Sequence, residues 1–349
     1  MMPDRQLRLL VVDNFQIRRY GKGREGQGYR FACGAVRNDW RVMTFSERDI
    51  TRFLAPLGFL RNVGAAMMNR RLLRTCVNFR PDLVLIGHCD CVTNATLAKI
   101  RAALPGTKLV HVNVDPVWQA HTVDQIRARM ESCDAVFVTT AGEKLREWTT
   151  GRNAVGFLPN MCDPVMEHED VSRRDDCRYD LFFAGHDGPG DERVALLRDL
   201  APRLEGKVRF GLFGTCGRPP IAGVDYEDAL LASRMALSLN RIEGWKWYSS
   251  DRLAHLMGRG ILAFISAKSG YDHFFRPDEE AVFFTDAADL AAKVVKYAGD
   301  PAAARRVAAA GRARYHALFN AARVLRYIAE TVFAAPYSEP YEWAGEVYR

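Results

Sequence analysis

One segment of the 349-residue chain combines residue types and spacing that suit it to hold an anion. It runs from Leu239, at the end of an apolar strand-like run, through an aromatic stretch to a helix that opens with Ser-Ser-Asp-Arg. Ser249 or Ser250 is a natural N-cap, and a helix start offers free backbone N–H groups and a partial positive charge. Arg252 in the first turn is suited to paired hydrogen bonds with a diphosphate. Plain helix capping, with Arg252 in a structural ion pair, explains these residues equally well.

A second motif is the Gly-Lys-Gly-Arg-Glu-Gly run at residues 21–26, which satisfies the string GxGxxG. It begins eight residues after Asp13, where the first strand-like run ends, whereas a dinucleotide fingerprint lies directly in the strand-to-helix turn. The spacing therefore favours a flexible loop over an NAD site. Lys22 and Arg24 in this loop are candidates for contact with an anionic substrate.

The elements that must position these motifs alternate along the chain in two successive series. Apolar, β-branched runs separated by helical stretches predict two α/β domains with mostly parallel sheets. In such sheets, ligands bind at the carboxyl ends of the strands, where the strand order reverses. The expected strands are 7–13, 81–87, 108–115, 134–139 and 154–158, then 179–185, 207–214, 234–240, 261–265 and 281–284, followed by helices at 286–299, 301–314 and 320–333.

Composition sets the broad class of the protein. The chain is 48% hydrophobic and 26% charged, which is a globular balance that excludes low-complexity disorder and a small disulfide scaffold. The eight cysteines form no zinc-type pairs and are typical of thiols in a reducing compartment. Without an apolar run of transmembrane length or a signal-peptide-like start, we expect a cytoplasmic protein.

Charge is concentrated in the first half of the chain. Residues 1–165 hold 24 Lys and Arg against 15 Asp and Glu, while the remainder holds 25 against 27. This basic half is either a solvated surface or a face for an anionic partner, such as lipid phosphate, acidic glycan or nucleic acid. Arg70, Arg71 and Arg74 on one predicted helix allow peripheral contact with an anionic membrane. Because no nucleic-acid-binding motif accompanies the charge, we expect no nucleic acid partner.

Motifs in the second half resemble a known family. They are Tyr248 to Leu253, the Gly258-Arg259-Gly260 break, Phe274-Phe275, Asp278 to Phe284, Asp289-Leu290, Asp300 to Gly311, Tyr315-His316 and Arg323. Together they resemble the C-terminal signature of glycosyltransferases of the spore-maturation-protein type, a family-1-like group with the GT-B fold. The likeness spans roughly residues 180–330 and is looser in the N-terminal half.

The resemblance implies an α/β protein with two Rossmann-like domains whose parallel sheets face each other across a cleft, followed by C-terminal helices. Residues 1–165 would bind the acceptor and 179–320 would bind the nucleotide sugar, and the polar, charged composition of residues 166–178 predicts a linker between them. Residues 321–349 would form a helix and tail that pack back towards the N-terminal domain.

The resemblance also implies an activity, in which a sugar passes from a nucleotide-diphosphate sugar to a cell-envelope or surface glycan, or to a lipid-linked acceptor. The nucleotide sugar would be a co-substrate, with no cofactor and no metal. The chain departs from the family in two places. His255 stands at the position of a glutamate that handles the donor ribose, and Trp247 stands at a position where retaining relatives carry a second glutamate. The implied donor-binding residues are Gly185, Asn240, Tyr248, Ser249, Ser250, Asp251, Arg252 and His255.

An inverting reaction would need a base for the acceptor hydroxyl on the N-terminal domain. His88, Asp90 and Asp115 each follow a predicted strand end, and His88 has the most suitable intrinsic pKa, although a strand-terminal polar residue needs no catalytic role. His111 alternates with apolar residues and is predicted to be a packed core histidine. The alternatives are a nucleotide-sugar epimerase or hydrolase on the same fold and a non-catalytic nucleotide-sugar-binding protein. The enzyme would work in the cytoplasm or peripherally at the inner membrane face.

Overall fold

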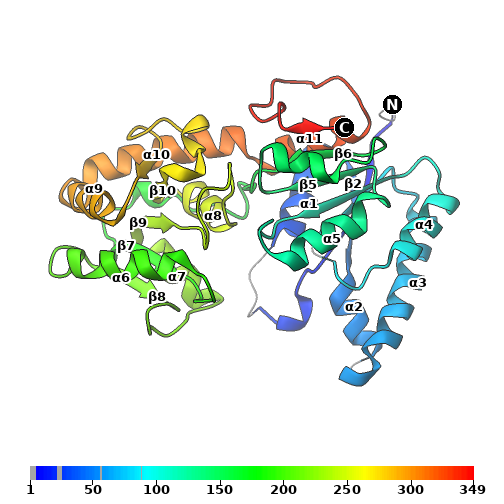
Figure 1. Cartoon of the computed structure of the whole chain (residues 1–349), viewed down its shortest axis with the longest axis horizontal. Helices are drawn as coiled ribbons and strands as arrows, with labels where there is room; N and C mark the ends of the chain where they lie inside the picture. The colour runs from blue at the N-terminus through cyan, green and yellow to red at the C-terminus, as the bar shows by residue number, and fades with distance from the viewer. Residues whose placement is uncertain (1–4, 22–25, 56, 88) are drawn as a thin grey trace. The chain divides into compact units, whose positions relative to one another are not determined.

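The computed structural model describes residues 5–21, 26–55, 57–87 and 89–349, and it divides the chain into two compact units. Unit 1 comprises residues 1–159 and 321–349, and unit 2 comprises residues 160–320 (Figure 1). The segment expected as a linker, residues 166–178, is part of unit 2, where Glu167 and Val171 are buried. No helix among the described residues combines the length and apolar character needed to span a bilayer.

Unit 1 is an α/β unit built on a seven-stranded sheet, in the order β12-β6-β5-β4-β3-β1-β2. Its strands pair in parallel except β12, which is antiparallel to β6. The strands are β1 (Arg8–Asp13), β2 (Arg41–Ser46), β3 (Leu83–Ile86), β4 (Lys108–Asn113), β5 (Ala135–Val138), β6 (Ala154–Phe157) and β12 (Val347–Tyr348). The helices are η1 (Ile17–Arg19), α1 (Gln27–Arg37), α2 (Glu47–Leu54), η2 (Gly58–Leu60), α3 (Arg61–Phe79), α4 (Asn94–Ala103), α5 (Ala120–Met130), η3 (Glu143–Trp148) and α11 (Ala321–Val332).

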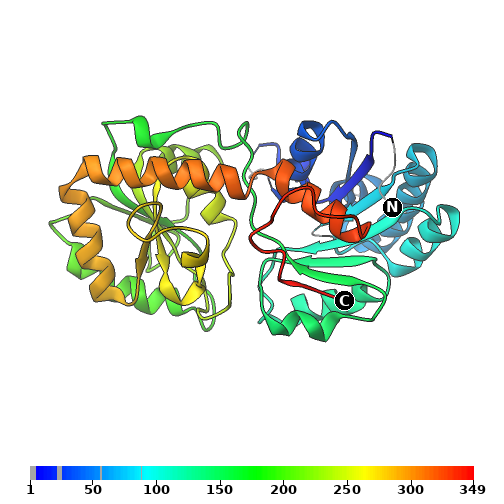
Figure 2. The ribbon, with the colours of Figure 1, turned by 90° about the horizontal axis from the view of Figure 1, so that it is seen from above.

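The last helix of the chain completes unit 1. Helix α11 lies beside α1 (Figure 2), and the backbone at Gly34 is the contact point. A Cβ added at Gly34 would lie 2.5 Å from the carbonyl oxygen of Ala321, a distance that only glycine permits. His111 is buried within β4, where Nδ1 lies 3.2 Å from the Ile86 carbonyl, so the prediction of a core histidine is confirmed.

Unit 2 contains a five-stranded parallel sheet in the order β11-β10-β9-β7-β8. Its strands are β7 (Tyr179–Ala184), β8 (Phe210–Phe213), β9 (Ser233–Ser238), β10 (Leu262–Ser266) and β11 (Val282–Phe284). Its helices are η4 (Val171–Arg173), α6 (Glu192–Leu204), α7 (Val224–Leu231), α8 (Arg252–Gly258), η5 (Ala267–Ser269), η6 (Tyr271–His273), α9 (Ala287–Gly299) and α10 (Pro301–Leu318).

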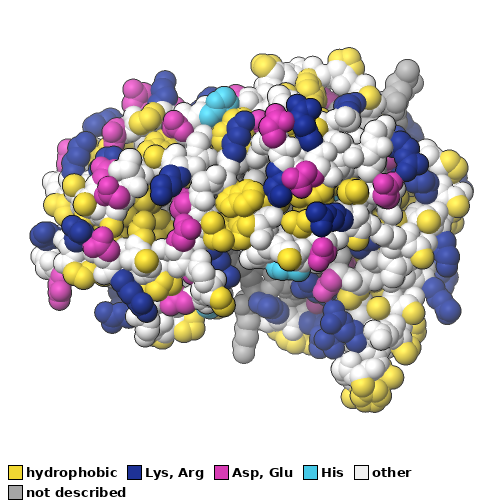
Figure 3. Space-filling view, in the orientation of Figure 1, with side chains coloured by type: hydrophobic (Ala, Val, Ile, Leu, Met, Phe, Trp, Pro, Cys, Tyr) yellow, Lys and Arg dark blue, Asp and Glu magenta, His cyan; other side chains and the backbone are white. Residues whose placement is uncertain are grey.

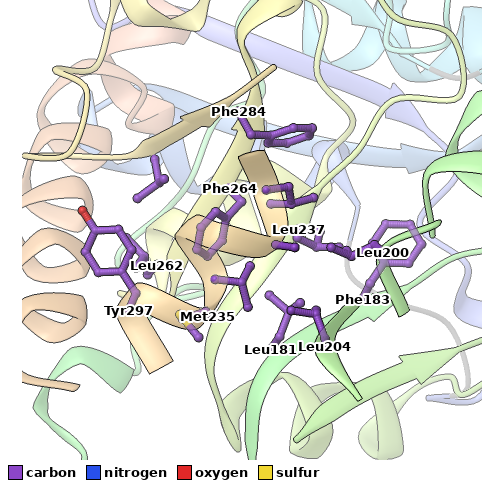
Figure 4. Packing of buried hydrophobic residues seen from close by; sticks show 14 of the residues in the cluster. Leu181, Phe183, Leu200, Leu204, Met235, Leu237, Leu262, Phe264, Phe284 and Tyr297 are labelled. Atoms are coloured by element: carbon purple, nitrogen blue, oxygen red, sulfur yellow. The ribbon is translucent and has the colours of Figure 1, made fainter. Parts of the chain in front are cut away.

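One buried apolar cluster of unit 2 lies on one face of this sheet. Alternate residues of β9 and β10, among them Met235, Leu237 and Phe264, point towards the apolar sides of α6 and α9 (Figure 4). These side chains are fully buried, and period-two alternation on a strand brings such residues to a single face. The rigid sheet fixes the positions of the loops that leave its carboxyl edge.

Candidate functional site

The candidate site of unit 2 lies where its strand order reverses. The chain passes from β7 to β8 on one side and then returns to β9 on the other side of β7. Connections leaving the two strands therefore diverge, and the carboxyl ends of β7 and β9 border a crevice of the kind in which open α/β sheets bind ligands. Gly185 follows β7, and Asn240 lies two residues beyond β9.

Arg252, the first residue of α8, joins these two strand ends. Its Nη2 donates to the carbonyl oxygen of Ala184 at 3.1 Å, and its Nη1 donates to that of Leu239 at 3.0 Å. The guanidinium also lies 4.7 Å from the centroid of the Phe183 ring. From the sequence, Arg252 is expected either to bind an anion or to form a structural ion pair. In the structure, its guanidinium donates these two hydrogen bonds to backbone carbonyls. They hold a cation at the reversal point.

The serines before α8 do not cap it. The N-cap position is Asp251, in right-handed helical conformation and without a side-chain cap hydrogen bond. Ser249 is buried, with its hydroxyl 2.8 Å from the hydroxyl of Tyr271, and accepts from Asn160 Nδ2 at 3.2 Å. Ser250 Oγ accepts from Arg252 at 3.2 Å. The predicted serine cap is wrong because the Ser249 hydroxyl makes tertiary contacts and the Ser250 hydroxyl accepts from the Arg252 side chain.

Asn240 and Tyr248 bracket the aromatic loop. Asn240 Nδ2 donates to the Tyr248 carbonyl at 3.1 Å, which closes the loop between β9 and α8. Asn240 Oδ1 is buried and has no hydrogen-bond partner among the described residues. Asn240 also lines a cavity of about 390 Å³ at the carboxyl edge of the sheet, within the size range of small-molecule sites.

Polar groups of both signs line this cavity. They include Glu192, Arg193, Glu243 and Lys268. Burial raises the pKa of Glu243, against the lowering effect of the hydrogen bond that its carboxylate accepts from the Asn240 backbone. Carboxylate and amide oxygens accept hydrogen bonds, so this lining can recognise hydroxyl and N–H groups.

The two positions that depart from the family pattern carry structural side chains. His255 is buried, with Nε2 3.0 Å from Asp251 Oδ2 and Nδ1 3.3 Å from Glu167 Oε1. Trp247 has a positive φ of 54° and stacks on His273 at 4.8 Å between ring centroids. Neither residue lines the 390 Å³ cavity.

The loops around Gly185 make a close backbone approach. A Cβ on Gly214, which has φ +69°, would lie 2.1 Å from the carbonyl oxygen of Gly185. Sequence reasoning missed Arg241, whose Nη1 lies 3.2 Å from a Cβ built on Gly188 in the loop after β7. Its position directly after Asn240 was the available signal.

Of the residues predicted for unit 1, His88, Lys22 and Arg24 lie outside the described residues. Asp115 follows β4, and its backbone N–H donates to Asn113 Oδ1 at 2.8 Å. β3 and β4 are parallel neighbours, so Asp115 shares a sheet edge with the loop that follows β3.

Asp90 in that loop is paired with two arginines. Arg48 Nε lies 2.6 Å from Oδ1 and Arg61 Nη2 lies 3.2 Å from Oδ2. Burial acts to raise the pKa of Asp90, but the hydrogen bond and charge of Arg48 outweigh it and hold that pKa below its ordinary value. A carboxylate held in this way is a weak base.

Sequence reasoning also missed Glu47, which begins α2 beside this group. Its side chain is fully buried, and Oε2 accepts from the Cys91 backbone N–H at 3.2 Å. Burial, then the charge of Asp90, raises the pKa of Glu47 to about 7. Ligand-type atoms of Glu47, Asp90 and Cys91 lie within 4.8 Å of one another. A metal ion there would compete with two guanidinium groups for Asp90, so this donor set is poorly suited to a cation.

Comparisons with known proteins address the fold and the second unit. Residues 193–330 match the family model described as glycosyl transferase-like. A search among curated proteins found no match. The chain aligns over 94% of its length with all of a sucrose-phosphate synthase from Thermosynechococcus elongatus, at 14% identity and a TM-score of 0.55. Anabaena HepE, solved with UDP and glucose, aligns with 94% of this chain over 100% of its own, at 11% identity and a TM-score of 0.55.

A glycosyltransferase from Rickettsia africae is similar over 96% of this chain and 100% of its own, with 10% identity and a TM-score of 0.51. At such identities the likeness concerns the fold, which is GT-B, and the predicted fold class of two α/β units with mostly parallel sheets is confirmed. The family-model match, which covers most of unit 2 and most of α11, and the GT-B fold of the chain together support a glycosyltransferase.

Proposed function

We propose that the protein transfers a sugar from a nucleoside-diphosphate sugar bound to unit 2 onto a glycan or lipid-linked acceptor of the cell envelope bound to unit 1. The observation that carries the proposal is Arg252, whose guanidinium is held at the strand-order reversal by the carbonyls of Ala184 and Leu239. A cation fixed at that point suits a diphosphate, because its geometry is set before the ligand arrives. The UDP with which HepE was solved supports uracil as the first nucleotide base to test.

The remaining residues have distinct roles in this proposal. The diphosphate lies near Gly185, where the absence of a side chain lets the backbone approach, and near Arg252 and Arg241. The side chains of Asn240 and Glu243 accept hydrogen bonds from ribose hydroxyls or the base, because both residues line the adjacent cavity. Glu243 thereby takes the role of the ribose-binding glutamate of the related family, whose position is occupied by His255 in this chain. Arginine charge neutralises the leaving diphosphate, and we expect transfer to need no metal.

Transfer with inversion requires a base on unit 1. Asp115 and His88 remain the candidates in this proposal, since Asp90 is engaged by Arg48 and Arg61. The base removes the proton of the acceptor hydroxyl as its oxygen attacks the anomeric carbon, and the bond to the diphosphate oxygen breaks.

The proposal is tested by the affinity for UDP, measured by calorimetry on the wild type and on Arg252→Lys. Lysine keeps the charge but lacks the planar fork that spans the two carbonyls and a ligand, so we expect at least a tenfold loss, equivalent to about 1.4 kcal/mol. Arg209→Ala is the matched control, because Arg209 pairs with Asp180 at the amino ends of β7 and β8. Wild-type protein that binds none of UDP, GDP, ADP or their sugars would overturn the proposal.

A second candidate is a nucleotide-sugar-binding protein without turnover. It is favoured by His255 and Trp247, which occupy the two glutamate positions of related enzymes and make structural contacts instead. Release of UDP from UDP-glucose separates the candidates. Acceptor-dependent release supports a transferase, acceptor-independent release supports a hydrolase, and tight binding without release supports the binding protein.

A further inference from the structure

The end of unit 1 formed by the turn from α2 into α3 exposes apolar side chains. Phe59 is 81% exposed, and Phe53, Leu57 and Val63 are each more than half exposed. Figure 3 shows hydrophobic side chains gathered at this end, which Figure 1 shows projecting from the rest of unit 1. Contiguous exposed apolar patches are uncommon on monomeric soluble proteins and mark interaction sites. We call Phe53, Leu57, Phe59 and Val63 the apolar tip.

Helix α3 continues the apolar tip into a basic face. At 100° per residue, Val63, Met67, Arg70, Arg71 and Arg74 fall within an arc of about 100°, and all five are exposed. The opposite face carries Met68, Leu72 and Cys76, which are buried in the core of unit 1. Residues 51–80 contain six arginines and no aspartate or glutamate. The exposed face is thus apolar at its tip and cationic behind it.

A pocket suited to an anion opens beside the tip. Its volume is about 240 Å³, and its lining includes Arg48, Arg52, Arg61 and Thr51. That volume is several times the ~30 Å³ that one water occupies in the liquid. Asp90 and Cys91 complete the lining, and Asp90 neutralises part of the charge of Arg48 and Arg61.

Two residues of the pocket lining carry polar groups that have no partner among the described residues. Thr51 Oγ1 is buried and has no hydrogen-bond partner among the described residues. The residues that the structure describes also form no ion pair or hydrogen bond with the Arg52 guanidinium. A guanidinium fork and a hydroxyl together match the acceptor oxygens of a phosphate.

We propose that the α2–α3 end of unit 1 docks on an anionic phospholipid membrane, with the apolar tip entering the interface and the Arg48–Arg52–Arg61 pocket binding a lipid phosphate. Three features favour this occupant. Apolar and aromatic residues beside a basic face match the interface of a bilayer with anionic headgroups. The pocket places phosphate-binding groups next to the residues that enter the lipid. Binding of a soluble phosphate would leave the apolar tip exposed to water. Docking of a second copy of the chain through the same face would place arginines opposite arginines.

The docking surface is independent of the donor site, and the experiment keeps the two apart. Co-sedimentation is measured with vesicles of phosphatidylcholine alone and with phosphatidylglycerol added, and UDP affinity is measured on each protein. We expect binding to the anionic vesicles only. Phe59→Ser should lower partitioning about tenfold, which corresponds to part of the transfer free energy of a phenylalanine side chain. Arg52→Gln should lower it about fivefold, near the ~1 kcal/mol of one basic residue at an anionic surface.

Matched controls remove similar groups elsewhere. Val224→Ser removes an exposed apolar side chain of unit 2, and Lys99→Gln removes an exposed charge on α4 of unit 1. Both should bind vesicles like the wild type. Melting curves confirm that Phe59→Ser and Arg52→Gln fold, and neither residue is buried.

Four results would overturn the docking proposal. The first two are no binding to anionic vesicles by a protein that still binds UDP, and equal partitioning of Phe59→Ser and wild type. The other two are saturable binding of inorganic phosphate at Arg52 without vesicle binding, and a wild-type dimer that Phe59→Ser dissociates. The last two would assign the surface to a soluble phosphate or to a second copy. Loss of UDP binding with intact vesicle binding would instead refute the donor site alone.

Discussion

Replacing Glu47 with glutamine should stabilise the folded protein above pH 7 and flatten its pH dependence. Burial, then the charge of Asp90, raises the pKa of Glu47 from 4.5 to about 7. Between these values the folded state holds a proton that the unfolded chain has released. The free energy of unfolding therefore falls as the pH rises through this window and is level above it. At 1.36 kcal/mol per pKa unit, the loss is about 3 kcal/mol.

Glutamine reproduces the protonated side chain. Its carbonyl oxygen can accept from the Cys91 backbone N–H as Glu47 Oε2 does, and its amide can donate to Asp90. The variant should therefore keep at pH 8 the stability that the wild type has near pH 5. Urea unfolding at both pH values measures this, and the wild-type loss minus the variant loss should approach about 3 kcal/mol.

Glu131→Gln is the control, because Glu131 is an exposed glutamate of the same unit that pairs with Arg152. It should leave the pH dependence unchanged. If wild type and Glu47→Gln lose the same stability between pH 5 and pH 8, Glu47 is ionised in the folded protein at neutral pH and the reasoning fails.

Two further predictions concern packing. Gly34→Ala should lower the free energy of unfolding by about 1–3 kcal/mol, because the new methyl group meets the Ala321 carbonyl at 2.5 Å; unchanged urea unfolding would show that α11 does not pack on α1. Leu237→Ala in the buried core of unit 2 should cost about 2–5 kcal/mol. A value below about 1 kcal/mol by the same measurement would mean that the core refills the cavity.

The regular elements were predictable where their burial is simple. Strands β1, β3 and β5 carry continuous apolar runs because both faces of a parallel sheet are covered, and the sequence located each of them. Strand β2 was missed because it lies at the sheet edge and exposes Arg41, Met43 and Thr44. The short β12 was also missed, since two residues carry no detectable period and its pairing with β6 brings together distant parts of the chain.

The residues around the candidate site were found more readily than their roles. The run at 248–253 was located by its aromatic and polar types, but capping by Ser249 or Ser250 was predicted from local preference alone. The hydroxyl of Ser249 meets Tyr271, which lies 22 residues away in sequence. Local propensity cannot include such a contact, and here it outweighs the capping preference.

The sequence by itself determined the α/β class, the positions of the central strands and the polar residues that follow them, because periodic burial and turn chemistry act over a few neighbouring residues. Only the tertiary structure decided which strand ends meet. It joined Arg252 to the ends of β7 and β9, and it placed Glu47 beside Asp90 and Cys91 in a buried group. Hydrogen bonds, desolvation and raised pKa values depend on atoms brought together across tens of residues, and no local pattern specifies those distances.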